Sequence, residues 1–396
     1  MKEKERTVYL NNAATSWPKP ACVYDAVRDA VQGLPPGQYR SGSGQNQGDV
    51  FDECRDLLGK LLGIGDAGRI FFTSGATESM NLVLKGLGIP AEQVITTVTE
   101  HNSVLRPLYN LPGIAGRSAG QKEKPGKTAA SPLLLPCDEN GSVDPAAFEQ
   151  AAAKARKPGV VILNHCSNVT GAVQDAAAFG RIAKRYGFLF LLDVSQSAGC
   201  MEVDADAWMA DAVIFTGHKS LLGIPGTGGF FLREGVPYSP AKYGGTGKES
   251  QKLVFGSGEA SLEVGTQNVP GICALKAGVS WILERGVGRI REHEQALLRL
   301  AADTLSQTEG ITLFGANPGS GPVLSFCAEA LSPSDLGYIL SSSYHIVTRS
   351  GLHCSPLIHD DIGSGKKGTV RISFSPFTTR EDILALAHAL QQILQG

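Results

Sequence analysis

Short runs of apolar residues alternate with helical patterns through the first two thirds of the chain. The runs at 160–163, 188–192 and 212–215 carry no charged side chain, and segment 176–186 has apolar residues at helical spacing. Apolar strands joined by helices are typical of a parallel sheet that is covered on both faces. The pattern therefore predicts an α/β fold with a mainly parallel sheet, and a ligand crevice beyond the carboxyl ends of its strands.

The same reasoning predicts the remaining elements. Further strands are expected at 8–10, 70–72, 94–98, 133–135 and 230–232. Helices are expected at 20–31 and 49–62, in the segments after Glu78 and Pro145, and as one long helix from Pro270 to about Ser306. A smaller α/β part follows, with strands at 323–326, 346–347 and 370–374 and helices at 333–341 and 379–394. We therefore expect a large cofactor-binding domain at 15–265 and a small domain formed by 1–14 and 266–396.

Composition narrows the classes of function. The chain has 396 residues, of which 42% are hydrophobic and 19% charged, with a formal net charge of -2. This balance gives no support for nucleic-acid or membrane binding, and no apolar stretch is long enough to span a bilayer. The charged first residues lack an apolar signal core, so we expect a cytoplasmic protein. The 8 cysteines form no C-x-x-C pair, so neither a metal site nor a disulfide framework is expected.

A lysine and an aspartate follow two of the apolar runs. Lys219 ends the motif Thr216-Gly217-His218-Lys219, and glycines beyond it would let backbone approach a ligand closely. Desolvation lowers the pKa of a lysine, and a neutral amine can form a Schiff base. The alternative is a lysine whose ammonium group reaches solvent at a strand end. Asp193 ends the preceding apolar run. A carboxylate at that position is costly unless it pairs with a cation, which indicates a cationic partner. The alternative is that Asp193 caps the following segment.

Two other segments carry candidate binding groups. Ser74-Gly75-Ala76-Thr77-Glu78 lies between a strand and a helix, where N–H groups and the helix dipole favour a phosphate. The alternative is ordinary N-capping by Ser74 or Thr77, completed by Glu78. His101 follows the strand at 94–98 and could stack on a planar ring, or it could be a structural histidine.

These motifs, in this order, resemble those of the class V aminotransferase family of pyridoxal-phosphate enzymes, and most closely its cysteine desulfurase branch. Residues 216–219 resemble the Schiff-base motif, 74–78 the phosphate loop, 99–103 the ring-stacking segment, 168–171 the asparagine segment near the cofactor hydroxyl, 193–196 the Asp-x-x-Gln segment, and 263–266 the segment that reaches the neighbouring subunit's phosphate. The resemblance implies a fold type I, aspartate aminotransferase-like architecture and a homodimer with shared active sites. It also implies pyridoxal 5′-phosphate held by Ser74, Gly75, Ala76, Thr77, His101, Asn168, Asp193, Gln196, Thr216, His218, Lys219 and Thr266.

The resemblance extends to the substrate. Residues 349–354 resemble the catalytic cysteine loop of the desulfurases, and 370–373 the segment whose arginine, here Arg371, clamps the substrate carboxylate. By this resemblance Lys219 removes the Cα proton, with help from His101, and Cys354 takes the sulfur of cysteine as a persulfide while alanine is released. Further candidates for substrate contact are Asn168, Arg40 and Asn12.

Alternatives remain for these residues. Cys354 could be a buried structural thiol, although Arg349 and His353 are cations or donors near it in sequence and would favour a reactive thiolate. Arg371 could be a surface strand residue. The segment 111–131 has no counterpart in the family core, and we expect it to be a surface loop.

Other functions also stay open on the sequence. Selenocysteine lyases resemble this branch closely, so the substrate is cysteine or selenocysteine, and a partner protein could accept the sulfur. The nearest alternative is a class V transaminase or a C–S lyase without a protein thiol. A Rossmann oxidoreductase would need G-x-G-x-x-G after its first strand, and the sequence has none there. A non-enzymatic scaffold would show no cofactor absorbance.

Overall fold

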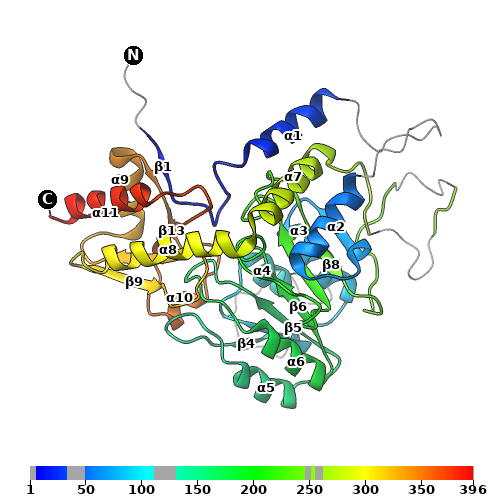
Figure 1. Ribbon diagram of the computed structural model, residues 1–396. Coiled ribbons are helices and arrows are strands. Elements are labelled where there is room, and N and C mark those ends of the chain that lie inside the picture. The colour runs from blue at the N-terminus through cyan, green and yellow to red at the C-terminus, as the bar shows by residue number, and fades with distance from the viewer. Residues whose placement is uncertain (1–5, 34–49, 111–130, 246–250, 255–261, 396) are drawn as a thin grey trace.

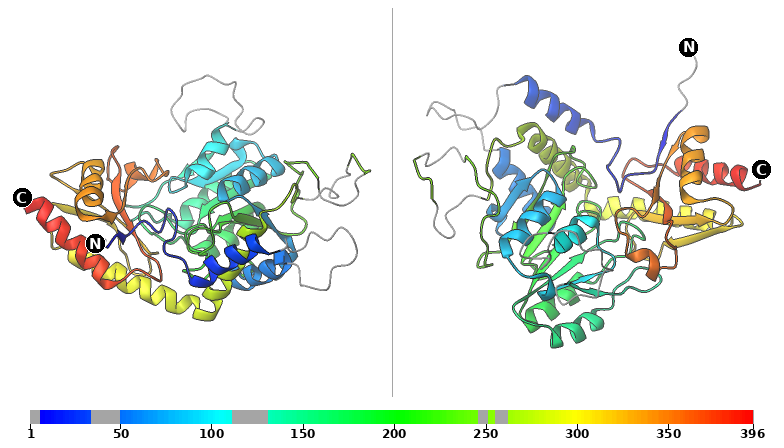
Figure 2. Two further views of the ribbon diagram at one scale, coloured as in Figure 1. Left: turned by 90° about the horizontal axis from the view of Figure 1, so that it is seen from above. Right: turned by 180° about the vertical axis from the view of Figure 1, so that it is seen from behind.

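The chain folds into two lobes that lie side by side (Figure 1, Figure 2). The computed structural model describes residues 6–33, 50–110, 131–245, 251–254 and 262–395. A seven-stranded sheet forms the larger lobe, and a four-stranded sheet with a separate two-stranded pair forms the smaller one. In that pair β1 (Val8–Tyr9), near the N-terminus, lies parallel to β11 (Ile346–Val347).

Short apolar strands build the large sheet. Their order is β2 (Ile70–Thr73), β8 (Gly228–Leu232), β7 (Ala212–Thr216), β6 (Phe188–Asp193), β5 (Gly159–Asn164), β3 (Val94–Thr97) and β4 (Leu133–Leu135). Every neighbouring pair is parallel except the two that involve β8, which runs against both β2 and β7. This confirms the mainly parallel sheet that the apolar runs predict.

Helices cover both faces of the large sheet. On one face α3 (Ala76–Leu87) and α4 (Asn102–Asn110) pack into the cluster that contains Leu191 of β6. The next residue, Leu192, points into the opposite cluster. That cluster is completed by α2 (Val50–Leu62), α5 (Pro145–Lys154), α6 (Ala176–Tyr186) and α7 (Val269–Arg285). Burial on both sides explains why these strands are apolar throughout rather than alternating.

The smaller lobe packs helices against an antiparallel sheet. Its strand order is β12 (Arg349–Gly351), β13 (Thr369–Ser373), β10 (Val323–Ala328) and β9 (Ile311–Gly315). The helices of this part are α8 (Val287–Leu305), α9 (Pro333–Tyr344), α10 (Ile358–Asp361) and α11 (Arg380–Gln395). The apolar pattern does not predict α4, α10, β9 or β12, because these elements are short or only half-buried. Within the described ranges, no helix combines the length and apolar character needed to cross a membrane.

The predicted single helix from Pro270 to about Ser306 is wrong. Two helices, α7 and α8, meet at Gly286, whose φ of 85° no helical residue adopts. Glycine accepts this angle without a Cβ penalty, so it ends the first helix and lets the second take a new direction. α7 packs on α1 (Ala21–Gln32) and α2 in the larger lobe, whereas α8 runs from the larger lobe into the smaller one (Figure 1). The division of domains at 265 stays a prediction.

Gly180 sits where α6 crosses close to backbone. A Cβ at this position would collide with the backbone oxygen of Trp208. Gly180→Ala is therefore expected to lower the free energy of unfolding by about 1–3 kcal/mol, because the helix must shift away from the segment that carries Trp208. Gly288→Ala is the matched control, since nothing lies within 4 Å of a Cβ built there. Urea unfolding measures both, and equal losses in the two variants would contradict the prediction.

Candidate active site

A cavity of about 340 Å³ lies at the carboxyl ends of the parallel strands. The predicted site residues that line it are Ser74, Gly75, Ala76, Thr77, His101, Asn168, Asp193, Gln196, Thr216, His218, Lys219 and Arg371. Residues of the smaller lobe, Arg349, His353 and Arg371, form part of the wall. The structure therefore brings together groups from distant parts of the sequence, at the edge of the sheet where parallel topology predicts a ligand.

Lys219 is partly buried and lines this cavity. Burial, together with the nearby cations Arg371 and Arg349, lowers its pKa to about 8, while the carboxylate of Asp193 opposes the shift. The ε-amino group is therefore partly neutral near pH 7, as covalent chemistry at an aldehyde requires. Lys219 lines the cavity together with the other motif residues, which favours the covalent role over that of a lysine whose ammonium group reaches solvent at a strand end.

Covalent attachment of pyridoxal 5′-phosphate to the apo protein is expected to accelerate as the pH rises through about 8. Only the neutral amine attacks an aldehyde, so the rate should rise about tenfold from pH 7 to pH 9. Stopped-flow absorbance measures it. Asp193→Asn should move the midpoint to lower pH, because Asp193 raises the pKa of Lys219. A midpoint at the ordinary lysine value of 10.5 would contradict the assigned environment.

Two carboxyl groups lie near the lysine. Asp193 Oδ1 accepts the N–H of Ser195 at 2.9 Å, as it would when capping a turn, yet the aspartate also lines the cavity. Glu100 is fully buried, and its Oε1 accepts the N–H of Asn164 at 2.9 Å. Burial and the charge of Asp193 raise the pKa of Glu100 to about 8. Of these two groups only Asp193 lines the cavity, so it is the one placed to face a pyridinium.

His101 is a neutral imidazole in this site. Its Nδ1 accepts the N–H of Ser103 at 3.0 Å. Burial and the cations Lys219, Arg349 and Arg371 lower the pKa of His101 to about 3. An uncharged ring that lines the cavity is suited to stacking on a planar cofactor.

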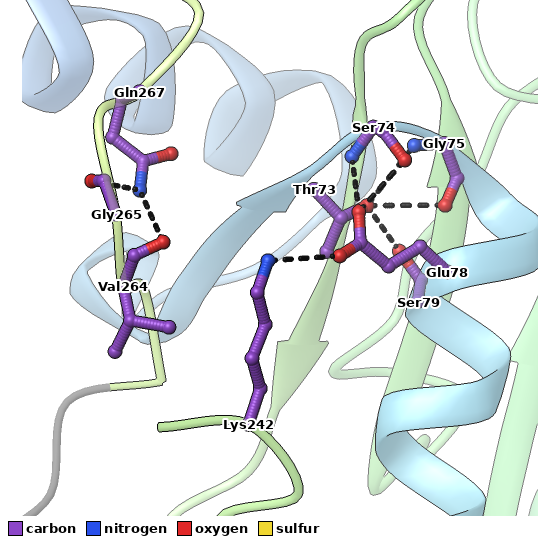
Figure 3. A network of polar contacts seen from close by, with 9 residues as sticks. All are labelled: Thr73, Ser74, Gly75, Glu78, Ser79, Lys242, Val264, Gly265 and Gln267. Carbon is purple, nitrogen blue, oxygen red and sulfur yellow. Dashed lines mark hydrogen bonds and ion pairs between the residues drawn. The ribbon is translucent and has the colours of Figure 1, made fainter. Parts of the chain in front are cut away.

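The loop before α3 combines internal polar contacts with ligand-facing groups. Glu78 Oε2 accepts the N–H and the hydroxyl of Ser74 at 2.8 and 2.7 Å (Figure 3). Lys242 forms an ion pair with the same carboxylate at 3.1 Å. The N-cap residue of α3 is Gly75, and no side chain caps the helix, so the capping alternative is wrong for Ser74 and Thr77. Ala76 and Thr77 are in the first turn of α3, where backbone N–H groups have no intrahelical acceptor. Those donors at the cavity wall are where a phosphate would bind.

Arg371 is buried, with 1% of its surface exposed, which excludes the surface-strand alternative. Its Nη1 donates to the carbonyl of Asn168 at 2.8 Å, and its Nη2 to Oδ1 of Asn11 at 3.3 Å. Burial, with the charge of Arg349, lowers the pKa of Arg371 to about 9. The charge of this buried guanidinium is met only by two neutral oxygen atoms, so Arg371 is well suited to bind a substrate carboxylate.

The other predicted substrate contacts fare differently. Asn12 does not line the cavity. Its amide is used within the protein, since Nδ2 donates to the carbonyl of Ser373 and Oδ1 accepts the N–H of Trp17. Its neighbour Asn11 is the asparagine that contacts the buried arginine. Arg40 lies outside the described residues. A substrate contact by Asn12 or Arg40 stays a prediction.

Cys354 lies beside the cavity on the loop between β12 and α10. Arg349 Nη2 donates to its Sγ at 3.0 Å, and the thiol is half-buried. Of the two possibilities left for His353, a cation or a donor, the cation is excluded near neutral pH, because burial and the charge of Arg371 lower the pKa of His353 to about 2. His353 Nε2 instead lies 2.8 Å from the hydroxyl of Thr369.

Thr266 lines a separate, smaller cavity of about 180 Å³ on the other side of the phosphate loop. The two cavities share Ser74, Glu78 and Gly226 as wall residues. Glu263 holds this segment in place, since it forms an ion pair with Arg55 at 2.6 Å and accepts the N–H of Phe72. Within one chain Thr266 is therefore not brought to the cavity of Lys219.

The sequence reasoning missed several wall residues. Asn164, Cys166 and Ser195 line the cavity, and each lies within two positions of a strand end or of a predicted motif. That position after a parallel strand is the signal that could have found them. Burial raises the pKa of the Cys166 thiol to about 12.

Comparisons with known proteins agree with this geometry. The family model described as aminotransferase class V matches residues 8–386. A probable cysteine desulfurase of Methanothermobacter thermautotrophicus is 30% identical over 98% of this chain and 94% of its own length. The cysteine desulfurase CsdA of Escherichia coli is 27% identical, with 98% and 94% covered. The apo structure of the cysteine desulfurase from Thermococcus onnurineus NA1 has a TM-score of 0.84 at 29% identity, covering 98% of this chain and 95% of that one.

Proposed function

Because the chain belongs to the class V aminotransferase family, we propose that it is a pyridoxal-phosphate-dependent cysteine desulfurase that converts L-cysteine to L-alanine. The sulfur is left as a persulfide on Cys354. The observation that carries the proposal is the thiol of Cys354, held by Arg349 beside a cavity that is lined by Lys219 and by the buried Arg371.

The residues present fit pyridoxal 5′-phosphate. Lys219 and Asp193 face one cavity, as the aldehyde and the pyridinium nitrogen of the cofactor require. Two buried polar atoms of the wall, Ser195 Oγ and His218 Nδ1, have no hydrogen-bond partner among the described residues. Buried polar groups are normally paired, so these atoms indicate a polar ligand in the cavity. When bound, the cofactor supplies an electron sink for the pair left at the substrate Cα.

Each residue of the site has a definite task in this proposal. Arg371 binds the substrate carboxylate through its guanidinium, and the partly neutral Lys219 accepts the Cα proton on its Nζ. The Cys354 thiolate, paired with Arg349, forms an S–S bond to the substrate sulfur while the substrate Cβ–S bond breaks. The electron pair of the broken bond stays with the substrate, which takes up a proton and leaves as alanine.

The assembly and the sulfur acceptor are part of the proposal. We infer a homodimer in which Thr266 serves the partner's phosphate site, because Thr266 lines a cavity separate from that of Lys219 in its own chain. Leu352, beside the thiol, is 37% exposed, which leaves the loop accessible to a protein that accepts the sulfur. Selenocysteine stays an alternative substrate, since the same loop would serve it.

The test is one visible spectrum of the purified protein before and after addition of cysteine, with product analysis. Alanine formed together with a persulfide on the protein is the expected result. Pyruvate and ammonia would instead indicate β-elimination without a protein thiol, and a transaminase would form neither alanine nor persulfide from cysteine alone. Absence of any cofactor absorbance would overturn the whole assignment.

A further inference from the structure

The side chain of Asn168 binds the loop of Cys354 at two points. Its Nδ2 donates to the carbonyl oxygen of His353 at 2.8 Å, and its Oδ1 accepts from the hydroxyl of Ser355 at 2.7 Å. These two residues stand directly before and after the cysteine. Ser355 is completely buried and Asn168 is 4% exposed, so water does not replace either bond. One amide therefore clamps the backbone on both sides of the thiol.

The clamped backbone has an unusual conformation. φ is 51° at His353 and 62° at Cys354, so two neighbouring residues with side chains occupy the left-handed region. Such angles are unfavourable for residues other than glycine, and they persist only where surrounding contacts impose them. Besides the clamp, the carbonyl of Cys354 accepts the N–H of Asn102 at 2.7 Å. The contacts of this loop are thus what keeps the cysteine in place.

The clamp also joins the thiol to the substrate-binding arginine. Arg371 Nη1 donates to the carbonyl of Asn168, the residue whose amide holds the loop. At the other side of the loop, Arg349 donates to Sγ of Cys354. A substrate bound by Arg371 would therefore meet a thiol whose position is set through Asn168.

We propose that Ser355 is a positioning residue for sulfur transfer: its hydroxyl fixes the Asn168 amide, which keeps Cys354 in the left-handed conformation that directs the thiol to Arg349. The inference rests on the proposed function, because it takes Cys354 to be the nucleophile. Ser355 does not line the cavity, so its hydroxyl acts on the reaction only through the loop.

The test is Ser355→Ala, which removes one oxygen atom and adds no bulk. Without the hydroxyl, Oδ1 of Asn168 loses its buried donor, and the loop populates other conformations. The kcat for alanine formation is expected to fall about fivefold to tenfold, with less than a twofold change in KM and an unchanged visible spectrum. Hydrogen exchange followed by mass spectrometry should show exchange about fivefold to tenfold faster at the amides of Ser355 and Asn102, which the loop conformation protects.

The matched control is Ser364→Ala. This hydroxyl is hydrogen-bonded to His359 Nδ1 at 2.7 Å in the same region and makes no bond to Asn168, so both readouts should stay at the wild-type level. Rates are divided by the concentration of cofactor-bound protein, which removes any contribution from unfolded chains.

The outcomes separate the two proposals. Unchanged exchange overturns the clamp, and faster exchange with an unchanged kcat overturns the positioning role. A wild-type protein that forms no alanine from cysteine refutes the proposed function, whereas the exchange comparison still decides whether Ser355 holds the loop.

Discussion

Lys219→Ala is expected to reduce alanine formation by about a thousandfold or more. The change removes both the amine that binds the cofactor covalently and the base for the Cα proton, and general base catalysis alone contributes about 10²–10⁴. Lys219 is the only lysine among the described residues that line the cavity, so no neighbouring amine takes its place. Steady-state alanine formation measures the loss, and borohydride reduction followed by peptide mass spectrometry shows whether the cofactor is still attached.

Lys276→Ala is the matched control for this change. Lys276 lies on α7 and forms an ion pair with Glu53 on the outside of the larger lobe, so its replacement should leave both readouts unaltered. Covalent attachment that persists in Lys219→Ala would place the reactive amine elsewhere, and the description of the cavity would then be wrong.

Cys354→Ala is expected to lower alanine formation from cysteine to less than about one hundredth of the wild-type rate, because the nucleophile for sulfur is lost. The visible spectrum and its change on adding cysteine should be retained, since Cys354 does not line the cavity. With selenocysteine, alanine formation that survives the change would favour selenocysteine lyase activity, in which the weaker C–Se bond breaks without a protein thiol.

The matched control here is Cys22→Ala, which removes an exposed thiol on α1. It should leave both the rate and the persulfide unchanged. Wild-type rates from cysteine in Cys354→Ala would remove the persulfide step from the mechanism and support a C–S lyase instead.

The large sheet could be predicted from the sequence because each buried strand is a continuous apolar run. β5, β6 and β7 are buried at every described position or nearly so, and their polar ends mark the carboxyl edge of the sheet. Once the edge is known, the residues after each strand must meet there. The proposed cofactor residues from Ser74 to Lys219 are therefore the part of the candidate site that local pattern reveals best.

The substrate side was harder to predict because its residues act through tertiary contacts. Asn168 lines the cavity as expected, but its side chain also binds His353 and Ser355, which are far away in sequence. The sequence left open whether His353 is a cation or a neutral donor, because the depth of its burial is a property of the fold and not of the local sequence. Which of the neighbouring residues Asn11 and Asn12 contacts Arg371 depends on the direction of their side chains, and in a turn that direction changes from one residue to the next.

α8 has a mechanical consequence for the enzyme. Its residue Ile290 is anchored in the core of the larger lobe, and Leu305 in the core of the smaller one. At a rise of about 1.5 Å per residue, these anchors are roughly 22 Å apart, so the helix is a lever arm. A tilt of only about 3° at one anchor would displace the other by about 1 Å, and a misplacement of that size can cost about a hundredfold in rate. Substitutions at either anchor, Ile290 or Leu305, would thus lower the turnover rate although both residues are distant from every reacting atom.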